Sequence, residues 1–254
     1  MSFIERQRQI ENVLQLERKI LVDDLSRRFG VSEVTIRKDL TDLEVRGVLL
    51  RTHGGAVIAE RPDMVVPMHR RSLEQVSEKN RVARAAARRI KDGESILLDT
   101  GSTTLALARE LRGRNLNVIT NSVLIAVELA TDEQINVIVL GGTLRRSSYA
   151  LMGSLALEQV RLLHVDRAFM GASGFDPKTG FSCQNLIEAE TKRAMLKTAH
   201  DKVLLVDRSK FERSAFAPFC PLKEVDCVIS DDTPSRAVIE ALHRAKVELV
   251  VARQ

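Results

Sequence analysis

The sequence predicts a small α+β domain at the N-terminus, followed by a larger α/β domain. Residues 4–58 read as two helices, a tight turn, a third helix and a pair of short strands. From residue 94 onward, short apolar runs alternate with helical patterns, which is typical of parallel strands joined by helices. The length of 254 residues accommodates one large domain or two smaller ones, so both regions have room to bury a core.

The composition is that of a globular protein, with 44% apolar and 29% charged residues. No run of 18 apolar residues is present, and the charged segment 1–19 lacks the apolar stretch of a signal peptide. We therefore expect a cytoplasmic protein without a membrane partner. The three cysteines are odd in number and form no C-x-x-C pair, so we expect neither disulfides nor a structural zinc site, and no other metal or cofactor is predicted.

The net charge of +5 is concentrated in residues 61–93, which carry 9 Lys or Arg against 4 Asp or Glu, whereas the rest of the chain is balanced. A basic segment beside a DNA-binding module can add phosphate contacts. It can equally be a solvated helix face. Charge alone therefore does not predict nucleic-acid binding, and the motifs must carry that argument.

The first helices are predicted from apolar residues at helical spacing, over 4–17 and 22–29. Gly30 then permits a tight turn with positive φ, which other residues adopt only under strain. Ser32 is a good N-cap for a third helix, because its hydroxyl can accept a backbone N–H of the first turn. Gly47 is expected to end that helix.

The third helix has one apolar stripe, formed by Ile36, Leu40 and Leu43 at positions i, i+4 and i+7. Residues 48–57 then read as two short strands about a glycine-containing turn. Helix, helix, turn, helix and hairpin in this order predict a winged helix-turn-helix.

Burying that stripe leaves polar side chains on the outward face, where they can read base edges or hold phosphates, while the hairpin lies near the DNA backbone or a minor groove. The alternative is that Arg37 and Lys38 only solvate a surface helix, paired with Glu33 or Asp42. The combination of turn, cap, stripe and hairpin favours DNA binding. The candidate DNA-binding residues are Ser32, Glu33, Thr35, Arg37, Lys38, Thr41, Arg51 and His53.

Residues 22–57, "VDDLSRRFGVSEVTIRKDLTDLEVRGVLLRTHGGAV", resemble the N-terminal domain of the DeoR family of bacterial transcription regulators. The "VS-x-x-TIR-x-DL" core and the "R-x-HGGA" ending both match. The resemblance implies that the helix beginning at Ser32 enters the major groove of double-stranded operator DNA.

The region after the hairpin is polar and contains two prolines without a sustained period, which predicts a linker over residues 59–76. A helix resumes near Ser77 and ends near Gly93. We therefore predict a DNA-binding domain over 1–58 and an α/β domain over 77–254. The basic helix 78–91 lies between them in sequence, which makes it a candidate coupling element.

The α/β domain is predicted to be Rossmann-like, with helices on both faces of a parallel sheet. The expected strands are 95–99, 117–120, 135–140, 165–170, 202–207, 226–230 and 247–251, and the expected helices are 104–111, 122–130, 155–162, 187–200 and 234–245.

Open parallel sheets bind ligands at the carboxyl ends of their strands, and five strand ends here carry small, hydroxyl or basic residues. In "DTGSTT", residues 99–104, Gly101, the hydroxyls of Ser102, Thr103 and Thr104, and a helix start together suit a phosphate. The chain lacks G-x-x-x-x-G-K-[ST] and G-x-G-x-x-G, which favours a small phosphorylated metabolite over ATP or a dinucleotide. The alternative is an ordinary capped turn between strand and helix.

The segment "NLIEAETKRAM" places Glu190 and Lys192 beside Arg193 near a helix start. A carboxylate and an ammonium next to a sugar phosphate can transfer protons or hold hydroxyls. The alternative is a surface helix in which Glu188 pairs with Lys192.

The segments "DTGSTT", "TNS", "GGTLRRSSYALMG", "EAETKRAM" and "VDRSKF" resemble, in matching order, the C-terminal sensor domain of the same DeoR family, a domain that is similar to ribose-5-phosphate isomerase. The resemblance implies a phosphorylated sugar or a related metabolite as effector. The implied effector-binding residues are Asp99, Gly101, Ser102, Thr103, Thr104, Asn121, Gly141, Gly142, Gly171, Glu190, Lys192, Asp207 and Lys210.

The sequence therefore predicts a repressor of carbohydrate uptake or catabolism genes, gated by such a metabolite and without catalytic residues. Helix-turn-helix proteins usually bind two half-sites, so self-association as a dimer or tetramer is expected. The alternative is a sugar-phosphate isomerase with an attached DNA-binding domain.

Overall fold

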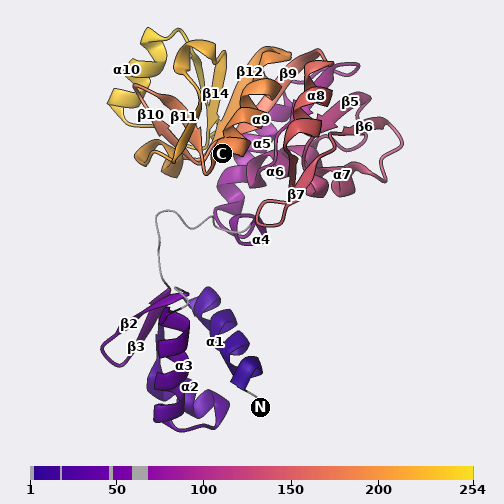
Figure 1. The fold of residues 1–254 in the computed structure, drawn as a ribbon. Coiled ribbons are helices and arrows are strands. Elements are labelled where there is room, and N and C mark those ends of the chain that lie inside the picture. The colour runs from indigo at the N-terminus through magenta and orange to yellow at the C-terminus, as the bar shows by residue number, and fades with distance from the viewer. Residues whose placement is uncertain (1–2, 18, 46–47, 59–67, 254) are drawn as a thin grey trace. The chain divides into compact units, whose positions relative to one another are not determined.

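The computed structural model of the chain describes residues 3–17, 19–45, 48–58 and 68–253 (Figure 1). The chain divides into two compact units, residues 1–64 and 65–254. Of the predicted linker 59–76, the first nine residues lie outside the described part. The remainder contains a short helix, α4 (Met68–Arg71), which the sequence analysis did not expect.

The first unit is a winged helix-turn-helix. Its elements, in chain order, are α1 (Phe3–Glu17), β1 (Lys19–Leu21), α2 (Val22–Phe29), α3 (Glu33–Val45), β2 (Leu49–Thr52) and β3 (Gly55–Ile58). The strands form one antiparallel sheet in the order β1-β3-β2. The sequence analysis missed β1, because three residues are too few to display an alternating pattern and the partner strand β3 lies far along the chain.

The turn between α2 and α3 has the expected chemistry. Gly30 has a φ of 64°, and its N–H donates to the carbonyl of Ser26. The Ser32 hydroxyl accepts the N–H of Thr35 at 3.2 Å. The stripe of Ile36, Leu40 and Leu43 is fully buried in a core that includes residues of α1 and α2. Gly47, the expected end of α3, lies outside the described residues.

Two glycines join the hairpin to the rest of this unit. The N–H of Val22, at the start of α2, donates to the carbonyl of Gly54 at 2.9 Å. Gly55 faces β1 so closely that a Cβ there would lie 2.1 Å from the carbonyl oxygen of Ile20. A side chain at position 55 would therefore force β1 and β3 apart.

The second unit contains a seven-stranded sheet in which every neighbouring pair is parallel, in the order β15-β14-β12-β9-β4-β5-β6. The strands are β4 (Ser95–Leu98), β5 (Leu116–Thr120), β6 (Ile135–Val139), β9 (Val165–Gly171), β12 (Ala199–Val206), β14 (Cys227–Ser230) and β15 (Glu248–Val251). The strand order reverses between β4 and β9, which is where open α/β sheets bind ligands.

Helices cover both faces of this sheet, as predicted (Figure 1). One core cluster contains residues of α8 (Ser154–Arg161), α9 (Leu186–Lys197) and α10 (Arg236–Arg244). The other contains residues of α5 (Val76–Ala87), α6 (Ser102–Glu110) and α7 (Val123–Leu129). Successive sheet residues alternate between the two clusters, so both faces of the sheet are buried.

Short antiparallel strands and 3-10 helices flank the sheet and were not predicted. They are the hairpin of β7 (Thr143–Arg145) and β8 (Ala150–Met152), the three-stranded sheet of β10 (Gly174–Asp176), β11 (Gly180–Cys183) and β13 (Ala217–Cys220), and the 3-10 helices η1 (Arg208–Glu212) and η2 (Leu222–Glu224). Helix α9 also ends three residues earlier than expected, because Ala199 already pairs with Val165 in the sheet.

Candidate functional site

The outward face of α3 carries the predicted charged residues. Glu33, Arg37 and Lys38 are exposed, and Arg37 forms an ion pair with Glu33 at 2.8 Å. Both side chains are about half exposed, at 51% and 49%. Exposed pairs contribute little to stability and exchange partners readily. Arg37 can therefore leave Glu33 for a phosphate or a base edge.

Arg51 connects the hairpin to α3. Its guanidinium donates to the hydroxyl of Thr41 at 3.1 Å, and its backbone N–H donates to the carboxylate of Glu44 at 2.9 Å. These contacts hold β2 against the exposed face of the helix. His53 is exposed at the hairpin turn. The charged side chains predicted on α3 and on the hairpin thus lie on two elements that are hydrogen-bonded to each other.

Ser32 and Thr35 are engaged at the start of α3, where their hydroxyls lie 2.9 Å apart. The sequence analysis missed Val34, which is 74% exposed on the first turn of the same helix. Val34 lies three positions before Arg37 and four before Lys38, a spacing that places the three residues on one helix face and could have indicated Val34. An exposed methyl group there can contact a thymine methyl.

A buried ion pair fixes α3 against α1. The guanidinium of Arg6 donates to the carboxylate of Asp39 at 2.5 and 3.2 Å. The Asp39 side chain is 1% exposed and that of Arg6 is 11% exposed. The hydrogen bond to Asp39 raises the pKa of Arg6. The orientation of the outward face of α3 therefore depends on the contact between Asp39, on the buried side of this helix, and Arg6 of α1.

The second unit contains a small polar cavity at the point where the strand order reverses. It is lined by Arg71, Asp99, Thr100, Asn121, Ser148, Ala150, Met152, Glu188, Thr191 and Lys192. Asp99 follows β4 and Asn121 follows β5, so the cavity lies at the carboxyl ends of the strands. The space open to the centre of a water molecule is about 10 Å³, which is room for about one water.

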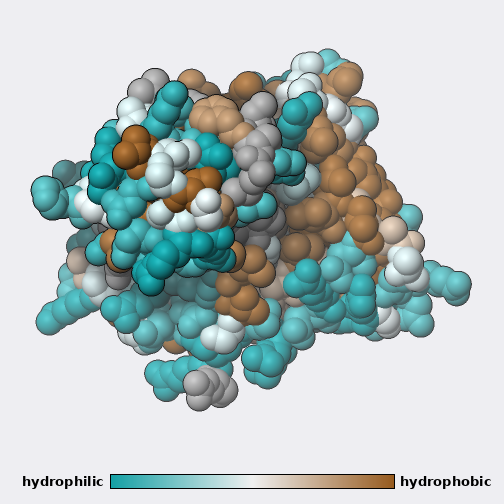
Figure 2. Space-filling model, turned by 90° about the horizontal axis from the view of Figure 1, so that it is seen from below, coloured by the Kyte–Doolittle hydropathy of each residue, from teal (hydrophilic) through white to brown (hydrophobic). Residues whose placement is uncertain are grey.

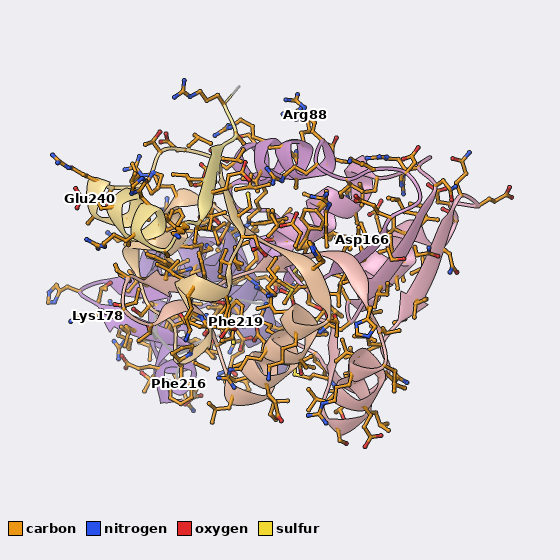
Figure 3. All side chains as sticks on the ribbon, turned by 90° about the horizontal axis from the view of Figure 1, so that it is seen from above. Arg88, Asp166, Lys178, Phe216, Phe219 and Glu240 are labelled. Carbon is orange, nitrogen blue, oxygen red and sulfur yellow. The ribbon has the colours of Figure 1, made fainter. Side chains whose placement is uncertain are left out.

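Lys192 is the centre of a buried charged cluster in this wall. Its ammonium contacts the carboxylate of Asp99, donates to the carbonyl of Gly171 at 2.9 Å and lies 3.9 Å from the carboxylate of Glu188. It also lies 5.1 Å from the ring centre of Phe219, which is labelled in Figure 3. The N–H of Gly171 donates to Asp99 at 3.1 Å. Asp99, Gly171 and Lys192, predicted together, form one connected group.

The charges of this group shift one another's pKa. Burial raises the pKa of Asp99, and the nearby Lys192 opposes that shift. Burial lowers the pKa of Lys192, but Asp99 and Glu188 outweigh it and leave the pKa above its ordinary value. The ammonium is therefore charged at neutral pH, and it is held in place by two carboxylates.

Glu190 does not reach this cavity. It is exposed, whereas Glu188 lines the wall. Positions 188 and 192 are one helical turn apart on α9 and share a face, which position 190 does not. Glu188 also accepts from the guanidinium of Arg145 at 3.2 Å. The pairing of Glu188 with Lys192 that the sequence suggested is present, but in the interior of the unit.

Asn121 is positioned by its neighbours. The Thr100 hydroxyl donates to its carbonyl oxygen at 3.0 Å, and its own amide donates to the carbonyl of Leu151 at 3.3 Å. These bonds link the ends of β4 and β5 to β8. Two neutral hydrogen-bonding groups thus lie beside the charged cluster, an arrangement suited to a ligand with hydroxyls.

The phosphate loop begins next to Asp99 but does not line the cavity. Gly101 precedes α6, and the Thr104 hydroxyl donates to the carbonyls of Asp99 at 2.5 Å and Gly101 at 3.0 Å. Ser102 is half-buried and Thr103 is buried. The Thr104 hydroxyl is thus used to hold the loop together. The phosphate-binding role predicted for this loop would fall to the first N–H groups of α6.

The remaining predicted residues lie elsewhere. The N–H of Gly141 donates to the Gln159 side chain at 2.6 Å, and Gly142, with a φ of 128°, leads into the β7–β8 hairpin. Asp207 caps η1 and pairs with Lys210 at 3.2 Å. None of these four residues lines the cavity.

Several lining residues were not predicted: Arg71, Thr100, Ser148, Ala150, Met152, Glu188 and Thr191. Arg71 belongs to the basic stretch 61–93 and to the part of it that was predicted to be a linker. Among the described residues, no group of three or more His, Cys, Asp or Glu side chains is arranged to hold a metal ion. No helix in the described ranges is long and apolar enough to cross a membrane.

Comparison with known proteins gives a family match to both units. Residues 6–61 match the DeoR-like helix-turn-helix domain, and residues 74–232 match the DeoR C-terminal sensor domain. The chain is 35% identical to the HTH-type transcriptional regulator YulB of Bacillus subtilis (strain 168), over 98% of this chain and 96% of that protein. It is 31% identical to the glycerol-3-phosphate regulon repressor of Escherichia coli (strain K12), over 98% of this chain and all of that protein.

Among solved structures, ribose 5-phosphate isomerase A from Methanocaldococcus jannaschii is similar over 52% of this chain and 53% of that one, with 25% identity and a TM-score of 0.39. That TM-score is too low for the likeness to carry an argument about function.

Proposed function

Because the chain belongs to the DeoR family of DNA-binding transcriptional regulators, we propose that it represses genes of carbohydrate uptake or catabolism and that a phosphorylated sugar or related metabolite controls its affinity for DNA. The observation that carries the effector half is the buried cavity at the carboxyl ends of β4 and β5. Its walls combine cations, carboxylates and neutral hydrogen-bonding groups, which suits a small ligand with a phosphate and several hydroxyls.

The DNA-binding half rests on the face formed by α3 and the hairpin. Arg37 and Lys38 are exposed on the helix, and Arg51 lies beside them on β2. We assign base-edge and phosphate contacts to these side chains and a phosphate or minor-groove contact to His53. Ser32 and Thr35 are assigned to the start of the helix, with backbone contacts to the DNA.

In the sensor, we assign the start of α6, residues 101–104, to the phosphate and the cavity group of Asp99, Asn121 and Lys192 to the sugar hydroxyls. Free N–H groups at a helix start and a positive partial charge suit an anion. Related proteins support the chemistry, since one of them is the glycerol-3-phosphate regulon repressor of Escherichia coli.

We also propose that the protein acts as a dimer or tetramer without catalysing a reaction. Strand β6 is an edge of the sheet, and its Ile138 and Val139 are 39% and 42% exposed. Helix α7 and strand β7, which carry the exposed apolar residues Val127 and Leu144, lie on the same side of the sensor as β6 (Figure 1), and Figure 2 shows a hydrophobic area on the surface of the molecule. Exposed apolar edges favour pairing with another copy.

The isomerase alternative rests on the same buried charges. Proton transfer needs a base that can reach the substrate. Asp99 and Lys192 are instead bonded to each other and to Gly171, which suits recognition better than turnover. Conversion of ribose 5-phosphate or glucose 6-phosphate by the purified protein would contradict this part of the proposal.

The first test measures the melting temperature of the full chain with ribose 5-phosphate, glucose 6-phosphate, glycerol 3-phosphate and inorganic phosphate, and with the unphosphorylated sugars as controls. A ligand that binds only the folded state raises the melting temperature. An ester that does so should also change the affinity for an operator selected from random duplexes. If no ester has either effect, the effector half is wrong, whereas selection of a defined duplex by the wild type still supports DNA binding.

A further inference from the structure

Arg71 differs from the other charged residues of the cavity in having no ion-pair partner among the described residues. Lys192 contacts two carboxylates, and Arg145 pairs with Glu188. The guanidinium of Arg71 lines the same cavity, and its Nε is buried without a hydrogen-bond partner. A buried guanidinium that leaves donors unused is unfavourable unless a ligand supplies the acceptor.

Arg71 stays charged although its Nε is buried. Burial lowers the pKa of Arg71, but Glu188 and Asp99 oppose that shift. Because the pKa of arginine is far above neutrality, the side chain stays protonated. Its planar fork of N–H donors matches the oxygens of a phosphate. An anion in this cavity would supply the acceptor that the guanidinium of Arg71 lacks.

The cavity cannot admit a sugar phosphate without a movement of its walls, because it has room for about one water. Small-molecule sites are usually several hundred cubic ångströms in volume. Asp99 and Asn121 follow strands of the central sheet, and Lys192 is a buried residue of α9. Arg71 instead belongs to α4, a helix of one turn. The wall that can yield most easily is the one that carries Arg71.

The backbone of Arg71 is bonded to the sensor on both sides of the residue. The N–H of Met68 donates to the carbonyl of Ser147 at 2.8 Å, and the Met68 side chain is fully buried. The ammonium of Lys79, on α5, donates to the carbonyls of Arg71 at 2.5 Å and Glu74 at 2.6 Å. Any shift of Arg71 is therefore transmitted to the chain on both sides of it.

This segment also reaches the second group of predicted effector residues. Burial lowers the pKa of Lys79, while the charge of Asp207 raises it and that of Lys210 lowers it. Lys79 is thus close enough to both to feel their charges, while its ammonium holds the carbonyl of Arg71. Lys79 therefore combines a hydrogen bond to the backbone of Arg71 with an electrostatic interaction with the Asp207–Lys210 pair.

We propose that Arg71 binds the phosphate of the effector from the cavity side, together with the start of α6, and that this contact shifts residues 68–79, the segment through which the chain enters the sensor from the DNA-binding unit. The inference rests on the proposed effector function and adds the residue and the segment that link occupancy of the cavity to DNA affinity. Residue 71 is four positions after residue 67, the last of the stretch that separates β3 from α4. A contact made by its side chain therefore acts close to the DNA-binding unit in sequence.

The experiment compares wild type with Arg71→Ala and Arg71→Lys, using the ester that raises the wild-type melting temperature. Loss of a charged hydrogen bond to phosphate should weaken its binding about 10- to 100-fold in Arg71→Ala, measured by calorimetry. Arg71→Lys, which keeps the charge without the fork, should fall between the two. Without ester, operator affinity by fluorescence anisotropy should stay within about twofold of wild type, because Arg71 is outside the first unit.

Arg146→Ala is the matched control, since Arg146 is an exposed arginine of the neighbouring β7–β8 loop that does not line the cavity. It removes the same charge and should leave both affinities unchanged. If Arg71→Ala binds the ester as tightly as wild type does, the assignment of Arg71 is wrong. A wild type that responds to no ester would instead refute the proposed effector function.

Hydrogen–deuterium exchange of the wild type tests the coupling without any variant. Saturating ester should change the exchange of peptides within residues 68–79, and peptides from β14 serve as the internal reference. Tight binding with unchanged exchange in 68–79 would overturn the coupling step, even if Arg71→Ala binds weakly.

Discussion

The two units use the same kinds of charged residue in opposite surroundings. On α3, Arg37 and Glu33 are about half exposed and form a pair that water can replace. In the sensor, Lys192 and Asp99 are 4% and 2% exposed and depend on each other. An exposed pair can be lost at little expense of stability, whereas removing one partner of a buried pair leaves an uncompensated charge. The first arrangement suits a surface that must exchange partners, and the second suits a fixed part of a cavity wall.

The largest expected effect comes from breaking the buried pair in the sensor. Lys192→Met keeps much of the side-chain volume but leaves Asp99 with the N–H of Gly171 as its remaining donor. We expect the free energy of unfolding of the sensor unit to fall by about 3–5 kcal/mol. Urea denaturation of the full chain, followed by circular dichroism, measures this change.

The double variant Lys192→Met/Asp99→Asn is the control for that prediction. It removes both charges, so it should recover a substantial part of the lost stability. A single variant that loses less than about 1 kcal/mol would show that Asp99 finds another partner or a proton at little expense.

The buried pair of Arg6 and Asp39 lies in the DNA-binding unit. It tests whether burial, rather than the unit in which a pair lies, decides how much stability is lost when one partner is removed. Arg6→Met leaves the carboxylate of Asp39, a residue of α3, buried without its ion-pair partner. We expect the first unit to lose about 3 kcal/mol and operator affinity to drop with it. Differential scanning calorimetry should show a lower transition for the first unit only. Unchanged operator affinity would mean that α3 is held by its apolar stripe alone.

Arg37→Ala tests the exposed pair. Because the side chain is half exposed, the free energy of unfolding should change by no more than about 0.5 kcal/mol. Operator affinity should fall about 10- to 100-fold if Arg37 contacts a base. Fluorescence anisotropy measures the affinity, and Arg236→Ala, an exposed arginine paired with Glu240 on α10, is the control. Wild-type affinity in Arg37→Ala would remove α3 from the DNA interface as assigned.

The smallest effect is expected at the cysteines. Burial raises the pKa of Cys183, Cys220 and Cys227 to about 12, so at pH 8 all three are neutral thiols. Only the thiolate reacts, so reactivity should rise with pH toward that value. Iodoacetamide at pH 8 should therefore modify the native protein at none of them and the urea-unfolded protein at all three, as read by mass spectrometry. Rapid modification of the native chain would indicate local opening.

Patterns set by a local period were predictable from the sequence. The stripe of Ile36, Leu40 and Leu43 and the positive φ of Gly30 depend on residues a few positions apart. The rule that ligands lie at the carboxyl ends of parallel strands also placed Asp99, Asn121 and Gly171 at one edge of the sheet, whereas Lys192 was predicted from a helix start and the family resemblance.

Features that depend on packing between distant segments were not predictable. The choice of Glu190 over Glu188 was an error in the phase of α9, whose first two residues, Leu186 and Ile187, are apolar yet 63% and 55% exposed. Arg71 reaches the cavity from a segment that carried no period, and β1 is defined only by its pairing with β3. No short stretch of sequence contains these contacts.

The contact between Gly54 and Val22 has a consequence for re-engineering this regulator. The hairpin turn supplies the acceptor for the first N–H of α2, and Gly55 leaves no space for a side chain beside Ile20. The hairpin therefore cannot be exchanged on its own. A loop transplanted from another protein would remove the acceptor for the N–H of Val22 and would disturb α2 and α3. The outward side chains of α3 are not constrained by a backbone contact of this kind. Recoding the target sequence should proceed by exchanging those side chains while the Gly-Gly turn is kept intact.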